Sequence, residues 1–291
     1  MKRNLLNSPR LLEIKKRRQK ILLKKIILRG FGLLIVFFLL VYISRIDKLN
    51  IDSVEIVNDG VTDTELVNAI VDEELAQKYL WLFPKTNLLF YPKKSIEAKL
   101  YESFKRLKEI KFLIVDNKIL RISLEERTAE YTWCGDIPDP EGEFADGSQC
   151  YFLDNSGYVF DGAPYFSGDV YFRFYGSVDG GGSDAPVGKY FSGANFAGVV
   201  SFIQMLKNID MKPTALYLVN AEEAKIYLSS AKSSVFGPEI LFKTGSDFER
   251  LAENLQSALS VDPLRSDFKK KYSSLLYIDL RFGNKVYYKF Q

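Results

Sequence analysis

The first 45 residues of the chain place a dense basic segment directly before an uncharged apolar stretch. Residues 1–29 contain eleven Lys or Arg and a single acid, Glu13, whereas residues 30–43 carry no charge. As a helix, residues 26–43 would extend roughly 27 Å, close to the ~30 Å hydrocarbon core of a bilayer. Because basic flanks stay in the cytoplasm, the pattern predicts a cytoplasmic tail over 1–25, a transmembrane helix over 26–44 and an extracytoplasmic remainder.

A cleaved signal peptide and a buried core helix are the alternatives for this stretch. The basic segment and the apolar stretch are both longer than a signal peptide needs, and no small-x-small cleavage site follows Ser44. A core helix of a soluble protein would show a polar face, which residues 30–43 lack. The membrane anchor is therefore the favoured interpretation.

Charge separates at the same boundary. Residues 1–45 hold 12 basic and one acidic side chain, which leaves 28 basic and 36 acidic in the remainder, a net charge of −8. We expect the basic tail to contact the anionic surface of the lipid bilayer. The mildly acidic remainder predicts no nucleic-acid partner.

Residues 49–126 show the pattern of a small α/β unit. Thr62-Asp63-Thr64-Glu65 matches a capping box, and residues 81–90 form an apolar connector between the two expected helices. The expected elements, in order, are a strand around Val54 and Ile56, a helix with an apolar stripe of Leu66, Ile70, Val71 and Leu75, a helix from near Ser95, and strands over 110–115 and 119–124.

Residues 128–291 are predicted to form a mostly antiparallel β-domain with two helices. Turn signals such as Asn155-Ser156-Gly157 and Gly283-Asn284 separate runs rich in aromatic and β-branched residues. The helices are expected over about 194–208 and from Ser246 onward. The strands are expected over about 150–154, 158–160, 170–175, 214–219, 224–229, 240–242, 275–282 and 285–290. The chain is thus assigned to the α+β class, with an N-terminal transmembrane helix, a βααββ unit and this β-domain.

Cys134 and Cys150 are the two cysteines, and both follow the predicted membrane span. An oxidising compartment would let them pair and close a short loop, which stabilises by about 3 kcal/mol in the chain-entropy model. Two free, partly buried thiols are the alternative. A redox-active pair is disfavoured because the C-x-x-C spacing is missing.

The sequence offers few candidates for catalytic residues. The chain has no His, which removes imidazole acid–base chemistry and Ser-His-Asp triads. The acidic stretch Asp136, Asp139, Glu141, Glu143 and Asp146 fits a solvated loop better than a catalytic or calcium site, since EF-hand spacing is absent. We therefore predict no catalytic residue, metal ligand or cofactor.

A glycine run and a lysine run are both interpreted as surface loops. The Gly180-Gly181-Gly182 loop is interpreted as a surface loop, because Gly188-Lys189 is followed by Tyr190 where a phosphate-binding loop has Ser or Thr. Lys269-Lys270-Lys271 is interpreted as a solvated loop, with a partner-binding or lipid-facing role as the alternative.

The last strand, residues 285–290, carries the main mechanistic expectation from the residues themselves. It ends the chain, so it is expected at a sheet edge whose unpaired backbone N–H and C=O groups can accept a strand from another protein. Its aromatic residues could instead complete the core, and strand alternation allows one face for each role.

Five short stretches, in order along the chain, match motifs of one family. They are Ser53-Val54-Glu55-Ile56 with Gly60-Val61-Thr62, Asn87-Leu88-Leu89-Phe90, residues 120–127 with Ala129 and Trp133, residues 150–160, and Tyr277-Ile278-Asp279-Leu280-Arg281-Phe282. Together with the basic tail, the single span and the element order, these stretches resemble the FtsQ/DivIB family of bacterial cell-division proteins. Thr86 stands where the family has a glycine.

The resemblance implies a POTRA-like domain over 49–126, which would contact other division proteins, and a non-enzymatic scaffold role at the division septum of the bacterial cytoplasmic membrane. It also implies that an FtsB-like partner, paired with an FtsL-like protein, docks on the C-terminal strand. The residues implied for this contact are Phe282, Val286, Tyr287, Tyr288 and Phe290. The rival interpretations are a POTRA-bearing component of envelope assembly or secretion, and a membrane-anchored extracytoplasmic enzyme that uses carboxylates.

Overall fold

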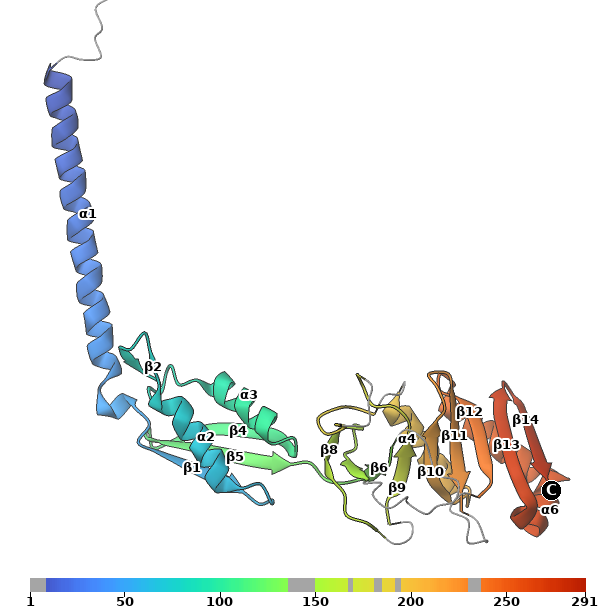
Figure 1. Ribbon diagram of the computed structural model, residues 1–291. Helices are drawn as coiled ribbons and strands as arrows, with labels where there is room; N and C mark the ends of the chain where they lie inside the picture. Colours follow the sequence, from blue (N-terminus) through green and yellow to red (C-terminus); the bar gives the residue numbers. More distant parts are fainter. Residues whose placement is uncertain (1–8, 136–149, 167–169, 181–184, 192–194, 230–236) are drawn as a thin grey trace, which may run out of the picture. The chain divides into compact units, whose positions relative to one another are not determined.

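The computed structural model describes residues 9–135, 150–166, 170–180, 185–191, 195–229 and 237–291 (Figure 1). This part of the chain is mixed α+β, with one apolar N-terminal helix and a large antiparallel-rich sheet. It divides into two compact units: unit 1 comprises Met1–Phe104 and Glu109–Glu125, and unit 2 comprises Lys105–Lys108 and Glu126–Gln291. The acidic stretch 136–146 and Gly181-Gly182 lie outside the described residues.

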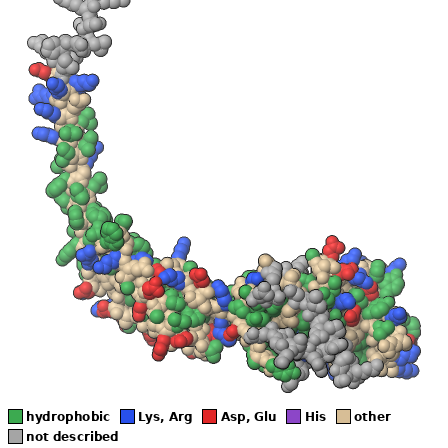
Figure 2. Space-filling model, viewed as in Figure 1, with side chains coloured by type: hydrophobic (Ala, Val, Ile, Leu, Met, Phe, Trp, Pro, Cys, Tyr) green, Lys and Arg blue, Asp and Glu red, His purple; other side chains and the backbone are tan. Residues whose placement is uncertain are grey.

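Helix α1 (Pro9–Ser44) is long and apolar enough to cross a membrane. Its most apolar window is only 6% buried, so it does not serve as a core helix of the described units. Figure 2 shows basic side chains along its first part and apolar side chains after them. The helix begins well before the predicted residue 26, because the Lys-, Arg- and Leu-rich segment that precedes it consists of strong helix formers and Pro9 suits a first helical position.

Unit 1 places two helices against a three-stranded sheet of order β1-β5-β4, in which β1 runs parallel to β5. The expected order of strand, helix, helix, strand and strand is observed, with a small hairpin where an apolar connector was predicted. Its elements are β1 (Ser53–Asn58), α2 (Thr64–Ala76), β2 (Lys78–Tyr79), β3 (Phe83–Pro84), α3 (Lys93–Ser103), β4 (Leu107–Val115) and β5 (Ile119–Glu126).

The buried face of α2 includes Val71 and Leu75 of the predicted stripe but not Leu66. Asp63 caps the helix by accepting from the backbone N–H groups of Glu65 and Leu66. Val67 and Val71 are fully buried, whereas Leu66 is exposed. Glu74 is buried on the same face. Ser95 of α3 donates a hydrogen bond to its carboxylate at 2.9 Å, and Lys99 of α3 forms an ion pair with it at 2.7 Å. The tertiary contact to α3 thus sets which side of α2 faces inward.

Unit 2 is built on a nine-stranded sheet of order β14-β13-β12-β11-β10-β9-β6-β7-β8. Among its described strand pairs, β12–β13, β9–β10 and β6–β9 are parallel and the others antiparallel. The strands are β6 (Tyr131–Trp133), β7 (Tyr151–Leu153), β8 (Val159–Gly162), β9 (Phe172–Tyr175), β10 (Pro213–Leu218), β11 (Glu223–Leu228), β12 (Glu239–Lys243), β13 (Leu275–Phe282) and β14 (Lys285–Phe290). The helices are α4 (Phe196–Asn208), α5 (Phe248–Ser260) and α6 (Leu264–Lys271).

The core of unit 2 lies between the sheet and its helices. Ile226 of β11, Phe242 of β12 and Ile278 of β13 are fully buried there, one from each successive strand. Phe202 of α4 contacts Phe242 with ring centroids 5.3 Å apart and stacks on Phe248 of α5 at 5.7 Å. Because side chains alternate along a strand, the neighbouring residues of these strands face the opposite side of the sheet, called here the helix-free side because none of the helices described in unit 2 packs on it.

Helix α6 corrects the prediction of two helices in this domain. Its stretch is short and carries one weak apolar pair, Leu264 and Phe268, so its helical period was not evident in the sequence. Lys270 and Lys271 therefore end a helix instead of lying in a loop, and Lys271 pairs with Asp267 one turn earlier at 3.1 Å. Basic residues suit the negative end of a helix dipole.

Cys134 and Cys150 are joined by a disulfide. They lie on the helix-free side of the sheet beside Tyr175, Ala215 and Tyr227. Burial raises the pKa of the Tyr227 hydroxyl to about 12. The bond links the residue after β6 to the residue before β7.

Candidate partner-binding edge

Strand β14 is the terminal strand of the nine-stranded sheet, with β13 as its neighbour in the described part of the chain. The two strands form an antiparallel hairpin through Gly283, whose φ of +69° is one that glycine adopts without strain. On its other side β14 presents backbone donors and acceptors outward. The position of β14 at the edge of the sheet is the one expected from the sequence.

Alternation divides the five residues proposed for partner contact into two groups. Val286, Tyr288 and Phe290 are half-buried and pack against the helix-side core of unit 2. Tyr287 lies on the opposite side of the strand, between the exposed Lys285 and Lys289. Three of the five residues therefore contribute to the core, which leaves Tyr287 and Phe282 on the surface.

A β-bulge puts Phe282 on the same side as Tyr287. Strict alternation from Leu280, a core residue, would turn Phe282 toward the helices. The pairing changes from Asp279↔Tyr287 to Phe282↔Lys285, so β13 has one extra residue in this interval. Phe282 consequently lies on the side of Lys285, away from the core.

Phe282 and Tyr287 form an exposed aromatic pair at the edge of the sheet. Their rings contact edge to face with centroids 5.3 Å apart, and their side chains are 56% and 48% exposed. The Arg281 guanidinium lies 5.9 Å from the Phe282 ring centroid. Aromatic residues with an adjacent Arg are the types that most often anchor protein interfaces.

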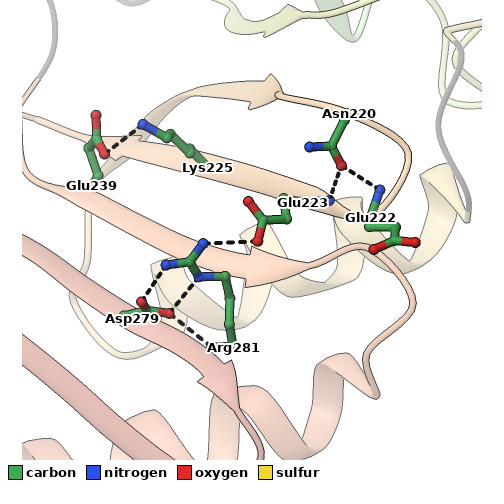
Figure 3. A network of polar contacts seen from close by, with 7 residues as sticks. All are labelled: Asn220, Glu222, Glu223, Lys225, Glu239, Asp279 and Arg281. Atoms are coloured by element: carbon green, nitrogen blue, oxygen red, sulfur yellow. Dashed lines mark hydrogen bonds and ion pairs between the residues drawn. The ribbon is translucent and has the colours of Figure 1, made fainter.

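A charged network supports the bulge from the helix-free face (Figure 3). The Arg281 guanidinium donates from Nε to Oδ1 of Asp279 at 2.9 Å and from Nη2 to Oδ2 at 2.7 Å. Its Nη1 donates to Glu223 of β11 at 2.9 Å, and the backbone N–H of Arg281 also donates to Asp279 Oδ1. This bidentate pairing fixes the Arg281 side chain beside Phe282.

The turn between β10 and β11 holds the other end of this network. Asn220 Oδ1 accepts from the backbone N–H groups of Glu222 and Glu223, at 2.8 and 3.0 Å. A second pair on the same face, Lys225 and Glu239, joins β11 to β12 at 3.1 Å with both side chains 30% exposed (Figure 3). Near the edge, this face thus carries two groups of ion-paired side chains with Leu241 between them in register, beside the exposed aromatic pair.

The carboxylates of this face are arranged for ion pairing. Burial by itself raises the pKa of Asp279, but the hydrogen bonds from Arg281 outweigh that effect and hold the pKa below its ordinary value. A carboxylate held ionised in this way is unsuited to donate a proton at neutral pH.

A cavity of about 430 Å³ lies beside β9 and β10, and none of its lining residues is a carboxylate. They are Val170, Tyr171, Phe172, Lys207, Met211, Lys212, Pro213 and Thr214.

The lowered pKa of Asp279 predicts a pH-dependent stability. Because its folded pKa lies below the unfolded value of about 3.8, the ionised group contributes stability above that pH, and the contribution is lost as the pH falls through the folded pKa. The Asp279→Asn variant should therefore be less stable than the native chain at pH 7, and the difference should shrink below about pH 4. Urea unfolding at a series of pH values measures it, and an equal difference throughout would contradict the assignment.

No group of three or more His, Cys, Asp or Glu residues that could hold a metal ion occurs among the described residues. The residues that sequence reasoning missed are Asp279, Arg281 and Glu223. Asp279 and Arg281 belong to the motif over residues 277–282, and opposite charges two residues apart on a strand were the available signal. Glu223 is 58 residues away in the sequence, and no local pattern connects it to Arg281.

The sequence matches no protein-family model, and a search of the curated proteins gives no significant match.

Proposed function

We propose that this chain is a non-enzymatic, single-pass membrane scaffold of the bacterial division machinery. In this proposal, α1 anchors it in the cytoplasmic membrane with the N-terminus inside. Its C-terminal edge strand accepts a strand of an FtsB-like protein that is itself paired with an FtsL-like protein. The scaffold thereby brings the regulators of septal wall synthesis to the division site.

The observation that carries the proposal is the exposed Phe282–Tyr287 pair on an edge strand. The backbone of β14 would supply hydrogen bonds to an added strand, and these give affinity for any extended peptide. The aromatic pair, with Arg281 beside it, would supply the side-chain contacts that select one partner. While the partner strand is bound, β14 would stay packed on the core of unit 2 through Val286, Tyr288 and Phe290.

The arrangement of unit 1 supports a POTRA-like assignment within the same proposal. Two adjacent helices lie against a three-stranded sheet, in which the first strand pairs parallel with the last. The order of strand, helix, helix, strand and strand is the one that the resemblance implied for residues 49–126. In the proposed scaffold this unit would contact further division proteins near the membrane.

Cellular position tests the proposal most directly. A fluorescent protein fused to the cytoplasmic N-terminus should give a band at the division site during constriction, and depletion of the protein should produce undivided filaments. An even signal around the envelope, with division unaffected by depletion, would contradict the scaffold role and favour an envelope-assembly function.

A further inference from the structure

The hairpin β2–β3 of unit 1 is held against the end of α1. Lys78 pairs with Pro84 and Tyr79 with Phe83, and the backbone N–H of Leu82 closes the turn on the Tyr79 carbonyl at 3.1 Å. The Arg45 guanidinium, just after α1, donates from Nε and Nη2 to the Leu82 carbonyl at 3.3 and 3.2 Å. Figure 1 shows the hairpin beside the last turns of the helix.

The tip of this hairpin is apolar and exposed. Leu80 and Trp81 are 77% and 90% exposed, and neither packs into the core of unit 1. Both have φ in the left-handed region, at +48° and +61°, a backbone conformation that bulky residues other than glycine rarely adopt. Two bulky apolar residues in a strained, solvent-facing turn indicate that the tip has a role other than folding.

An apolar cavity of about 600 Å³ lies between the hairpin and α1. Leu40, Ile43 and Ser44 line it from the helix, and Tyr79 and Phe83 line it from the hairpin. Leu49, Asn87, Leu89 and Phe90 complete the lining, and the last two residues are themselves exposed. The cavity and residues 89–90 thus form one apolar surface next to the helix end, and the exposed tip belongs to the hairpin that lines it.

The depth of this surface follows from its contact with α1. The ring of Phe83 contacts that of Phe37 with centroids 5.8 Å apart. Phe37 precedes Ser44 by seven residues, or roughly 10 Å along the helix axis. A side chain that reaches Phe37 therefore lies at the level of the uncharged stretch, 30–43, and not beyond its end.

We propose that the β2–β3 hairpin inserts into the extracytoplasmic leaflet of the membrane and that the cavity takes an acyl chain of a phospholipid. The inference rests on the proposed insertion of α1 as a transmembrane helix. If α1 spans the bilayer, lipid is the medium that surrounds residues 30–43, so lipid is the occupant expected for an apolar surface at that level.

Charge around the hairpin fits an interfacial location. Lys78 at its base is exposed, and Lys85 lies over the Tyr79 ring at 5.4 Å and pairs with Glu74 at 3.5 Å. Arg45 is also exposed where α1 ends. Basic groups at the level of the headgroups, with a Trp just inside them, are the arrangement found at membrane interfaces.

Tryptophan fluorescence of the full chain tests the inference, because Trp81 and Trp133 are its two tryptophans. Trp133 is 1% exposed in the core of unit 2 and donates from Nε1 to the Gly176 carbonyl at 2.8 Å. The chain is reconstituted in nanodiscs of phosphatidylcholine and phosphatidylglycerol, with or without bromine on the acyl chains. Brominated lipid should quench the native emission and leave that of Trp81→Phe unchanged.

A reporter in α1 separates failure of this inference from failure of the membrane span. Leu34→Trp in the Trp81→Phe background places the fluorophore within the apolar stretch. If brominated lipid quenches this reporter but not Trp81 of the native chain, the hairpin inference is wrong and the span stands. If it quenches neither, α1 does not insert and both fail. A Trp81 that is shielded from aqueous iodide but not quenched by bromine would indicate a protein occupant and overturn the lipid assignment.

Discussion

Phe282→Asp should weaken binding of the FtsB-like partner by roughly 30- to 1000-fold, the loss of about 2–4 kcal/mol typical of an interface anchor. Phe282 is exposed and contacts Tyr287 at the edge of the sheet, so the substitution removes an aromatic surface and adds a charge without opening the core. The free energy of unfolding should change by less than about 1 kcal/mol, as for most surface substitutions. Titration of the labelled partner complex into the full chain measures the binding.

Two controls make this result specific. Tyr165→Asp introduces the same charge at another exposed aromatic residue of unit 2 and should leave binding unchanged. Phe290→Ala, on the core side of β14, should lower stability instead of removing a surface contact. Normal binding by Phe282→Asp would sink the edge-docking proposal, and an unfolded product would assign Phe282 to the core.

Arg127→Met should destabilise the chain by about 3 kcal/mol, because it leaves a buried carboxylate without its cation. Asp154, 4% exposed, accepts from the Arg127 guanidinium, from the backbone N–H of Ser156 at 2.8 Å and from that of Tyr158 at 3.0 Å. Burial raises the pKa of Asp154, but the hydrogen bonds from Ser156, Tyr158 and Arg127 outweigh it and hold the pKa below its ordinary value. Methionine keeps an apolar side chain but removes the guanidinium, which also lies 4.0 Å from the centroid of the Tyr158 ring.

Urea unfolding measures this loss, with Lys225→Met as the matched control. Lys225 and Glu239 are joined at 3.1 Å but are both partly exposed, so breaking this pair should cost below about 1 kcal/mol. Adding Asp154→Asn to Arg127→Met should recover part of the stability, because the neutral amide is less costly to bury. Equal losses for Arg127→Met and Lys225→Met would show that Asp154 is not effectively desolvated.

Local patterns in the sequence were sufficient for much of the architecture. The long uncharged stretch predicted a helix able to span a membrane, because its length and its lack of a polar face are properties of the segment alone. The final hairpin was predictable because Gly283-Asn284 interrupts two alternating runs. The position of β14 at the edge of the described sheet agrees with the one expected for the outer strand of this hairpin.

The predictions failed where distant residues compete for a surface, and where an element is too short to show a period. Leu66 was expected in the core, but Glu74 and Val67 are buried because α3 brings Lys99 and Ser95 to that face of α2. Residues 81–90 were interpreted as a connector, since a two-residue strand pair has too few residues to show a period. Helix α6 was missed for the same reason.

The candidate site shows the same division between local pattern and tertiary structure. The sequence by itself predicted an aromatic strand at the sheet edge, and the family resemblance supplied the residues expected to contact a partner. Only the tertiary structure decided that Val286, Tyr288 and Phe290 face the core, since either side of an isolated hairpin could pack on the helices. Strand alternation would have buried Phe282, and the β-bulge that exposes it coincides with the pairing of Arg281 to Asp279 and Glu223, a contact between strands far apart in the sequence.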